Sequence, residues 1–236
     1  MTSLEPAQGD NVTADVDLDR AARCGFPEVI YGEGKPTALI IEILQRQAEA
    51  GQRGFVTRID SDQAGRICEV LPDAVYNVAA RTIAAHGYPL VNETAGSVAV
   101  VSAGSCDAPI AQEALETLRW MGVDSRLIED AGVAGPQRLL RHLPVLRAMS
   151  AIVVVAGMEA ALPSVIGGHV GCPIIGVPTS VGYGASLNGF TALLSMLTSC
   201  ASNVMTVNID AGFRGGYAAG LIARQAVQLK EHPDHG

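Results

Sequence analysis

The sequence predicts an α/β protein whose larger part is a parallel sheet covered by helices on both faces. Between Gly96 and the C-terminus, five short apolar segments alternate with longer segments of helical periodicity, which is the pattern of βαβ units. Segment 151–156 (AIVVVA) shows no polar alternation, as expected of a strand that is buried on both faces. Hydrophobic residues make up 48% of the 236 residues and charged residues 17%, so the chain can bury a sizeable core.

The elements of the larger part follow from these alternating segments. The predicted strands are 98–102, 126–129, 151–156, 173–177 and 204–209. The predicted helices are about 109–121, 136–149, 160–170, 187–197 and 217–230. We therefore expect residues 96–230 to form one flavodoxin-like domain, followed by a polar tail over residues 231–236.

The part of the chain before this domain predicts a small α/β region over residues 15–95. Its expected elements are a helix over 36–50, a strand over 55–59, a helix capped by Asp60 and running to Leu71, and a strand over 75–78. Segment 17–35 is interpreted as an irregular docking arm. Residues 1–14 are polar, and we expect them to be mobile.

Composition excludes several classes of function. The net charge is −8 and only 4% of residues are aromatic, which argues against nucleic acid as a partner. The longest apolar runs are strand-sized, and the N-terminus shows no signal peptide, so we expect no membrane association. The five cysteines are widely spaced and lack CxxC pairs, a pattern typical of reduced thiols in the cytoplasm.

Small and polar residues gather directly after the predicted strands. These segments are Ala103-Gly104-Ser105-Cys106-Asp107 and residues 130–135, 157–164 and 178–184. In an open parallel sheet, ligands bind beyond the carboxyl ends of the strands. Glycine-rich loops that enter helices offer free amides to phosphate groups. The sequence has no GxGxxG after the first strand and no P-loop, which disfavours a standard dinucleotide fold or an NTPase.

Each of these residues, taken singly, also has a structural interpretation. Asp107 could cap the following helix, and Glu159 could be a first-turn glutamate that the helix dipole favours. Cys200 follows a predicted helix and could be a packed thiol. Segment 180–184 could be a turn. His142 and His169 have no partner at metal-ligand spacing.

Taken together, several segments in order resemble the LarB family. The matching segments are Gly104-Ser105-Cys106-Asp107, residues 157–164 (GMEAALPS), residues 173–184 (PIIGVPTSVGYG), Ser199-Cys200-Ala201 and residues 208–213 (NIDAGF). The resemblance extends into the first region through residues 18–20 (LDR) and 25–32 (GFPEVIYG), and covers roughly residues 17–220. LarB is the carboxylase/hydrolase of nickel-pincer nucleotide biosynthesis, and its relatives include proteins labelled circadian phase modifiers.

The resemblance implies a reaction and its catalytic residues. The expected substrates are nicotinic acid adenine dinucleotide and carbon dioxide or bicarbonate. The expected products are AMP and pyridinium-3,5-biscarboxylic acid mononucleotide. Cys200 would be the thiolate that adds to the pyridinium ring, and Asp107 the acid/base group. Glu159 would hold a divalent metal, Mg²⁺, or activate water at the phosphoanhydride. No organic cofactor is expected.

The same resemblance implies substrate-binding residues and an assembly. The expected substrate contacts come from the loops and from two cations of the first region: Gly104, Ser105, Cys106, Gly157, Met158, Ser180, Gly182, Tyr183, Gly184, Arg23 and Lys35. Cys106 stands where serine is expected, and Thr198 where asparagine is expected, so affinity or rate could differ from the family pattern. Small residues in segment 185–201 would permit close packing between copies, and we expect a homo-octamer.

Two other functions stay open at this point. The second half resembles, more weakly, the purine-pathway mutase that moves a carboxyl group on aminoimidazole ribonucleotide. That enzyme has an Ala-His-Arg loop after its second strand, whereas residues 130–135 read DAGVAG and contain no histidine. A third interpretation is a nucleotide-binding regulator without catalysis. The presence of Asp107, Glu159 and Cys200 together favours the carboxylase/hydrolase.

Overall fold

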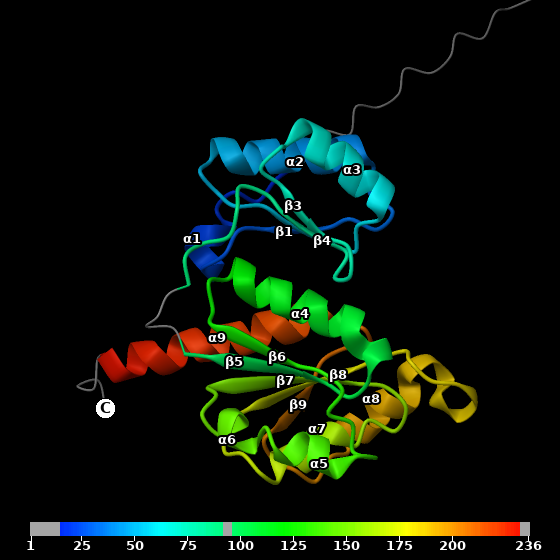
Figure 1. The fold of residues 1–236 in the computed structure, drawn as a ribbon. Coiled ribbons are helices and arrows are strands. Elements are labelled where there is room, and N and C mark those ends of the chain that lie inside the picture. Colours follow the sequence, from blue (N-terminus) through cyan, green and yellow to red (C-terminus); the bar gives the residue numbers. More distant parts are fainter. Residues whose placement is uncertain (1–14, 92–95, 232–236) are drawn as a thin grey trace, which may run out of the picture.

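The computed structural model describes residues 15–91 and 96–231, which form a small N-terminal α/β unit stacked on a larger one (Figure 1). The expected mobile N-terminus (residues 1–14) and residues 232–236 of the expected polar tail lie outside the described residues. No helix in the described ranges is long and apolar enough to cross a membrane.

The larger unit contains a five-stranded parallel sheet in the order β6-β5-β7-β8-β9. Its strands are β5 (Val98–Ser102), β6 (Ser125–Ile128), β7 (Ala151–Ala156), β8 (Ile174–Pro178) and β9 (Val204–Thr206). The five predicted strands therefore exist, and β9 ends three residues before its expected end. This sheet confirms the predicted flavodoxin-like class.

Helices cover both faces of the large sheet. Helices α4 (Ala108–Trp120) and α9 (Gly212–Glu231) pack on one face, and α5 (Pro136–Leu140), α6 (Leu143–Leu146), α7 (Leu162–Gly167) and α8 (Phe190–Leu197) pack on the other. Alternate residues of each strand enter the two cores: Val153 and Val155 face α4 and α9, whereas Ile152 and Val154 face the opposite layer. Burial on both faces explains the uninterrupted apolar segments.

Four predicted helices differ from the observed ones. Helix α9 (Gly212–Glu231) begins five residues before the expected start at residue 217. The single helix expected over 136–149 is split into α5 and α6, because Pro144 lacks an N–H and is tolerated only in the first turn of a helix; it is the second residue of α6. Helix α7 starts two residues late, after Met158 and Ala160 with φ of 53° and 49°. Residues expected at the start of a helix over 187–197 instead belong to the 3₁₀ segment η2 (Gly184–Gly189).

The small unit holds a four-stranded sheet in the order β1-β2-β4-β3. Its elements are α1 (Arg20–Cys24), β1 (Val29–Tyr31), α2 (Thr37–Glu49), β2 (Phe55–Thr57), α3 (Ser61–Val70), β3 (Val75–Asn77) and β4 (Thr82–Ala84). The prediction of an irregular arm over 17–35 is wrong, since this segment contains α1 and β1. A three-residue strand is too short to show a periodic pattern. Asp60 caps α3 as predicted, accepting from the Gln63 amide at 2.8 Å.

The two units share a hydrophobic core, and the carboxyl ends of strands from both sheets lie on the same side of the molecule. The Trp120 ring of α4 stacks on Phe55 and lies against Phe26, with centroids 5.3 Å and 5.5 Å away. Arg58, which follows β2, donates to the carbonyl of Asp210, which follows β9. The carboxyl ends of β2 and β9 therefore lie on the same side of the molecule.

Helices α4 and α9 approach closely through glycines. Gly212, Gly216 and Gly220 recur every four residues on α9, and a Cβ on each would collide with α4 or Met121, the residue that follows it. At Gly216 the collision is with the backbone of Ala114, whose carbonyl oxygen would lie 2.5 Å from the added carbon. Backbone atoms cannot rotate away, so this contact depends on glycine.

Gly216→Ala is expected to lower the free energy of unfolding by about 1–3 kcal/mol, because the added methyl forces α4 and α9 apart. Gly65→Ala is the matched control. Gly65 lies inside α3 with open space around its Cα, and there alanine should raise stability by about 0.5–1 kcal/mol through helix propensity. Urea unfolding of both variants measures the two changes. Equal changes of the same sign would contradict the packing argument.

Candidate active site

A cavity of about 460 Å³ opens at the carboxyl ends of β5, β6 and β7. Three loops wall it: residues 103–107 after β5, residues 130–134 after β6, and residues 156–162 after β7. Arg138 and Val181 complete the lining. The structure thus brings together seven of the predicted site residues: Gly104, Ser105, Cys106, Asp107, Gly157, Met158 and Glu159.

Asp107 is the buried carboxyl group of this cavity, with 4% of its surface exposed. One carboxylate oxygen accepts from the Thr179 hydroxyl at 2.7 Å, and the other accepts from the Gly104 amide at 3.0 Å. Asp107 occupies the residue before α4, but its side chain makes no capping bond to that helix. The structural interpretation of Asp107 as a helix cap is therefore wrong, because the side chain turns toward β8 instead.

The pKa of Asp107 is raised above its ordinary value, and burial is the largest cause. The hydrogen bonds from Thr179, Gly104 and Gly157 oppose this shift by favouring the charged form, and the nearby charge of Asp210 adds to it. A carboxyl group with a raised pKa and a fixed orientation in a cavity can accept and return a proton.

The loop after β7 adopts a strained backbone around a close contact. A Cβ at Gly157 would lie 2.5 Å from the Val181 carbonyl oxygen and 2.6 Å from the Thr179 hydroxyl oxygen. Met158, in the left-handed region, donates its amide to Val181 at 3.0 Å. Left-handed conformations of non-glycine residues are costly and cluster at functional sites. The contact fixes the loop beside the carboxyl end of β8.

Glu159 lies in this turn and is exposed. It precedes α7 by three residues, so it is not the first-turn glutamate of the structural interpretation. Within the described residues no group of three or more His, Cys, Asp or Glu side chains could hold a metal ion. Mg²⁺, however, is often held by one or two carboxylates together with substrate phosphates. Glu159 fits that arrangement.

The end of β6 carries an ion pair where the purine-type loop would carry a histidine. Arg138 of α5 contacts the carboxylate of Asp130, and both line the cavity. Asp130 has a φ of 54°, in the left-handed region that non-glycine residues rarely adopt. The pair supplies charge to the cavity wall, and no histidine of the described chain lines it.

The loop after β8 lies beside the cavity and contributes only Val181 to its lining. Ser180 donates its amide to the Asp210 carboxylate at 2.8 Å. Tyr183 is 81% exposed, between Gly182 and Gly184, both in the left-handed φ range. The predicted contacts Ser180, Gly182, Tyr183 and Gly184 therefore do not line the cavity within this chain.

Cys200 lies at the opposite edge of the sheet from Asp107. It follows α8 and precedes β9, so it sits at the amino ends of the strands, whereas Asp107 follows the carboxyl end of β5. The neighbouring Ser199 hydroxyl contacts the Ser164 hydroxyl of α7 at 2.7 Å. The six residues of β7 span about 20 Å between the two edges. Within one chain, the exposed Cys200 thiol and the Asp107 carboxyl group are not brought together.

The two predicted cations of the first region also lie away from the cavity. Arg23 of α1 is exposed and forms a two-bonded ion pair with Asp17, at 2.6 Å and 3.1 Å. This pair raises the pKa of Arg23 and lowers that of Asp17. Lys35 lines a separate hollow at the carboxyl ends of β1 and β2.

Sequence reasoning missed three residues of the site: Thr179, Arg138 and Asp210. Thr179 is fully buried and directly follows β8, so its position at the carboxyl edge was a usable signal. Arg138 gave none, because its partner lies in another loop. Asp210 was not named singly, although it lies within segment 208–213, which carries the family resemblance. Asp210 has a φ of 55° and binds both Ser180 and Arg58.

The fold and the cavity define a class: an α/β protein with a flavodoxin-like sheet and a buried carboxyl group of raised pKa at the carboxyl edge of that sheet. A family model for the LarB/PurE-like N-terminal domain matches residues 9–87, and a model for AIR carboxylase, the enzyme of aminoimidazole ribonucleotide, matches residues 97–233. The chain belongs to the LarB/AIR carboxylase-like family, as the sequence motifs predicted.

The chain is similar to two curated proteins and to one solved structure. An uncharacterised protein of Methanocaldococcus jannaschii is 40% identical over 219 residues, covering 89% of this chain and 83% of that protein. N5-carboxyaminoimidazole ribonucleotide mutase of Thermotoga maritima is 26% identical over 145 residues, covering 57% and 83%. The crystal structure of Treponema denticola PurE is 17% identical, covers 58% of this chain and 90% of that one, and superposes with a TM-score of 0.43.

Asp107→Asn is expected to lower turnover by about 10²–10⁴-fold, because an amide cannot take up the proton. The fold should survive, since an amide can still accept from Gly104 and donate to the Thr179 oxygen. Folding raises the pKa of the Asp107 carboxyl group. This group therefore stabilises the folded protein at acid pH, and that stabilisation is lost as the pH rises through the raised pKa. The stability of Asp107→Asn relative to the parent should therefore increase above about pH 4, the ordinary aspartate pKa.

Urea unfolding of the two proteins across this pH range measures the difference. A difference in stability that does not change with pH would contradict the raised pKa of Asp107. Unchanged turnover would remove Asp107 from the chemistry.

Proposed function

We propose that this protein is a pyridinium-3,5-biscarboxylic acid mononucleotide synthase. It carboxylates carbon 5 of the pyridinium ring of nicotinic acid adenine dinucleotide and hydrolyses the phosphoanhydride, which releases AMP. One observation carries the choice within the family: the end of β6 offers the Asp130–Arg138 pair in place of a proton-transferring histidine. The LarB-type N-terminal unit and Cys200 support the same choice.

The pyridinium ring needs a nucleophile before it can take up carbon dioxide. The Cys200 thiolate adds to carbon 4 of the ring, and the displaced electron pair makes carbon 5 an enamine carbon. Carbon 5 then attacks carbon dioxide and forms the new carbon–carbon bond. Loss of the proton on carbon 5 and expulsion of the thiolate restore the aromatic ring. No external oxidant or reductant is required.

Asp107 is the base that receives the carbon 5 proton in this proposal. Its two hydrogen bonds, from Thr179 and Gly104, hold the carboxylate toward β8. Burial raises its pKa, which makes the carboxylate a stronger base than an exposed aspartate. The cavity also excludes bulk water from the carboxyl group, whose exposed fraction is 4%.

Hydrolysis of the phosphoanhydride takes place at the mouth of the same cavity. Glu159 is exposed there and would hold Mg²⁺ together with the substrate phosphates. Such an ion, when bound, would stabilise negative charge on the phosphoanhydride. The free amides of the Gly104 loop would cradle a phosphate group.

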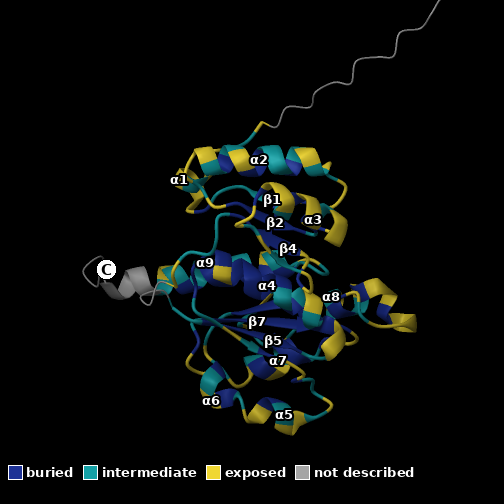
Figure 2. Cartoon of the chain, turned by 45° about the horizontal axis from the view of Figure 1, so that its top comes forward, coloured by how far each residue is buried: buried dark blue, intermediate teal, exposed yellow. Residues whose placement is uncertain are grey.

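Cys200 acts in the site of a neighbouring copy in this proposal, because it lies about 20 Å from Asp107 within its own chain. An apolar stripe beside Cys200 supports docking between copies. Phe190, Leu194 and Leu197 of α8 are 58%, 58% and 61% exposed, and α8 with η2 projects from the body of the molecule (Figures 1 and 2). Large exposed apolar patches mark interaction sites. We propose a homo-octamer.

The reactive thiolate also requires a reducing compartment. All five cysteines of the chain are unpaired in the structure. We therefore propose that the protein works in the cytoplasm.

The second candidate is a carboxylase or mutase of aminoimidazole ribonucleotide, which the similarity to the Thermotoga maritima mutase favours. The loop after β6 contains no histidine, which argues against this second candidate. A regulator without catalysis is the third candidate, and product formation of either kind excludes it.

Mass spectrometry of the products tests the proposal. Purified protein incubated with nicotinic acid adenine dinucleotide, bicarbonate and Mg²⁺ should yield AMP and a carboxylated mononucleotide. Aminoimidazole ribonucleotide, tested in parallel, should stay unchanged. The reverse pattern would move the assignment to the purine reaction.

Cys200→Ser should abolish carboxylation while substrate binding is retained, because a hydroxyl is too weak a nucleophile for the ring. Cys24→Ser is the matched control, since Cys24 is an equally exposed thiol on α1, and it should keep full activity. Product formation and substrate titration separate chemistry from binding. Full carboxylation by Cys200→Ser would exclude the covalent mechanism.

A further inference from the structure

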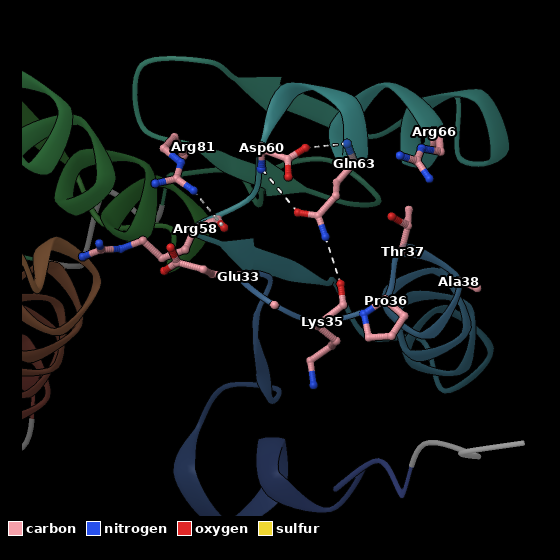
Figure 3. Close-up of a pocket in the computed structure, with 11 residues that line it drawn as sticks. Glu33, Lys35, Pro36, Thr37, Ala38, Arg58, Asp60, Gln63, Arg66 and Arg81 are labelled. Carbon is pink, nitrogen blue, oxygen red and sulfur yellow. Dashed lines mark hydrogen bonds between the residues drawn. The ribbon is translucent and has the colours of Figure 1, made fainter. Parts of the chain in front are cut away.

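The small unit has a hollow of its own at the carboxyl ends of its parallel strands β1 and β2. This hollow measures about 660 Å³ and shares no lining residue with the Asp107 cavity. Residues 33–38, between β1 and α2, form one wall, and Arg58, Asp60, Gln63, Arg66 and Arg81 form the other (Figure 3). Crossover loops at the carboxyl ends of adjacent parallel strands are the usual place for a ligand in α/β folds.

The acidic side chains of the hollow are already engaged. The Asp60 carboxylate caps α3 by accepting from the Gln63 amide. Glu33 accepts from the Tyr31 hydroxyl at 2.6 Å, and this bond lowers the pKa of Glu33. Neither carboxylate forms an ion pair with a cation of the hollow within the described residues.

Two of the four cations of the hollow bind other groups of the protein, and two contact no described carboxylate. Arg58 reaches away to Glu113 and the Asp210 carbonyl, and Arg81 donates to the carbonyls of Ile59 and Arg58. Lys35 and Arg66, in contrast, contact no carboxylate among the residues that the structure describes. Lys35 and Arg66 therefore line this hollow without an ion pair to any described residue, in a chain whose net charge is −8.

The start of α2 adds hydrogen-bond donors to the same wall. Helix α3 has its side-chain cap, whereas α2 follows Pro36, which supplies none. The amides of Thr37 and Ala38 donate to no acceptor in the described part of the chain, although both residues line the hollow. Figure 3 shows Arg66 and Thr37 on the same side of Gln63. The first turn of a 13-residue helix carries partial positive charge.

We propose that this hollow is a second binding site for a phosphate group, either free or carried by a nucleotide. The Thr37 and Ala38 amides would donate hydrogen bonds to the phosphate oxygens at the start of α2, as at other helix N-termini. Arg66 would bind two phosphate oxygens through its planar guanidinium, and Lys35 would add a flexible ammonium. Lys35, expected from the family resemblance to contact substrate, is thereby assigned to this second site. The site does not depend on the proposed reaction.

Calorimetric titration in phosphate-free buffer tests the site, with inorganic phosphate and AMP as probes. Both should bind the parent protein, and the double variant Lys35→Gln/Arg66→Gln should weaken AMP binding by at least about tenfold. Higher salt should also weaken it. Arg126→Gln, on the exposed face of β6, is a control that removes one positive charge outside the hollow and should leave AMP binding unchanged. Circular dichroism checks that the variants are folded.

Two sources of the phosphate are distinguished by steady-state kinetics. If the group belongs to the dinucleotide substrate, the double variant raises KM for nicotinic acid adenine dinucleotide as much as it raises the Kd of AMP. If a separate nucleotide occupies the hollow, KM is unchanged while AMP binding is lost. If the protein does not turn over nicotinic acid adenine dinucleotide, calorimetric titration of the parent and the double variant still tests whether the hollow binds phosphate. Equal AMP affinity of parent and double variant, or no binding of either probe to the parent, would overturn the proposal.

Discussion

The position of the two sheets relative to each other depends on two buried carboxylates of α4. Glu113 and Glu116 are each 2% exposed, on the face of α4 turned toward the small unit. Buried charges are costly unless they are paired and hydrogen-bonded. Arg58 pairs with Glu113 at 3.2 Å. Three groups contact Glu116: the Asn77 amide at 3.0 Å, Arg119 at 2.7 Å and the Tyr88 hydroxyl.

These pairs fix how the small unit sits on the large one. Burial raises the pKa of Glu113, and the guanidinium of Arg58 opposes that shift. Burial and the bond to Glu116 together raise the pKa of Tyr88. Removing either partner would leave a buried charge unpaired, so the two units separate only at a high free-energy cost. Figure 2 shows α4 as a largely buried layer between the two sheets.

The same contacts reach the candidate active site. Arg58 binds the Asp210 carbonyl as well as Glu113. The Asp210 carboxylate binds the Ser180 amide at 2.8 Å, and the adjacent Thr179 binds Asp107 at 2.7 Å. A short path of three hydrogen bonds, linked through Asp210 and the Thr179–Ser180 peptide bond, therefore joins the small unit to the Asp107 carboxyl group. The N-terminal unit therefore helps to hold the loops of the candidate active site in place.

The sequence was sufficient for the large sheet because its strands are uninterrupted apolar segments, such as AIVVVA over 151–156. It was also sufficient for the loops after β5 and β7, since small residues cluster there. It was insufficient for β1 and β4, which are only three residues long. Strands β2 and β3 are equally short, but they lie within the longer predicted segments 55–59 and 75–78. Glu113 and Glu116 look like ordinary surface charges of an amphipathic helix, and only tertiary contact shows their burial.

Cys200 illustrates a signal that was present and unused. In a parallel βαβ chain, a residue before a strand lies at the amino edge, and a residue after a strand lies at the carboxyl edge. The order of elements alone therefore separates Cys200 from Asp107 within one chain. Their joint action, which the family resemblance implies, requires a second copy of the chain.

Subunit complementation tests most directly whether Cys200 of one copy acts with Asp107 of another. Asp107→Asn and Cys200→Ser proteins, each inactive alone, are dissociated, mixed in equal amounts and reassembled, with parent protein treated in the same way. If the site is shared between copies, a complete site takes Asp107 from a Cys200→Ser copy and Cys200 from an Asp107→Asn copy. With equal amounts of both variants, about a quarter of the sites are complete, so about a quarter of parental carboxylation should return in the mixed oligomer. If mixed oligomers form and no activity returns, Cys200 and Asp107 do not act across copies, and the account of the site is wrong.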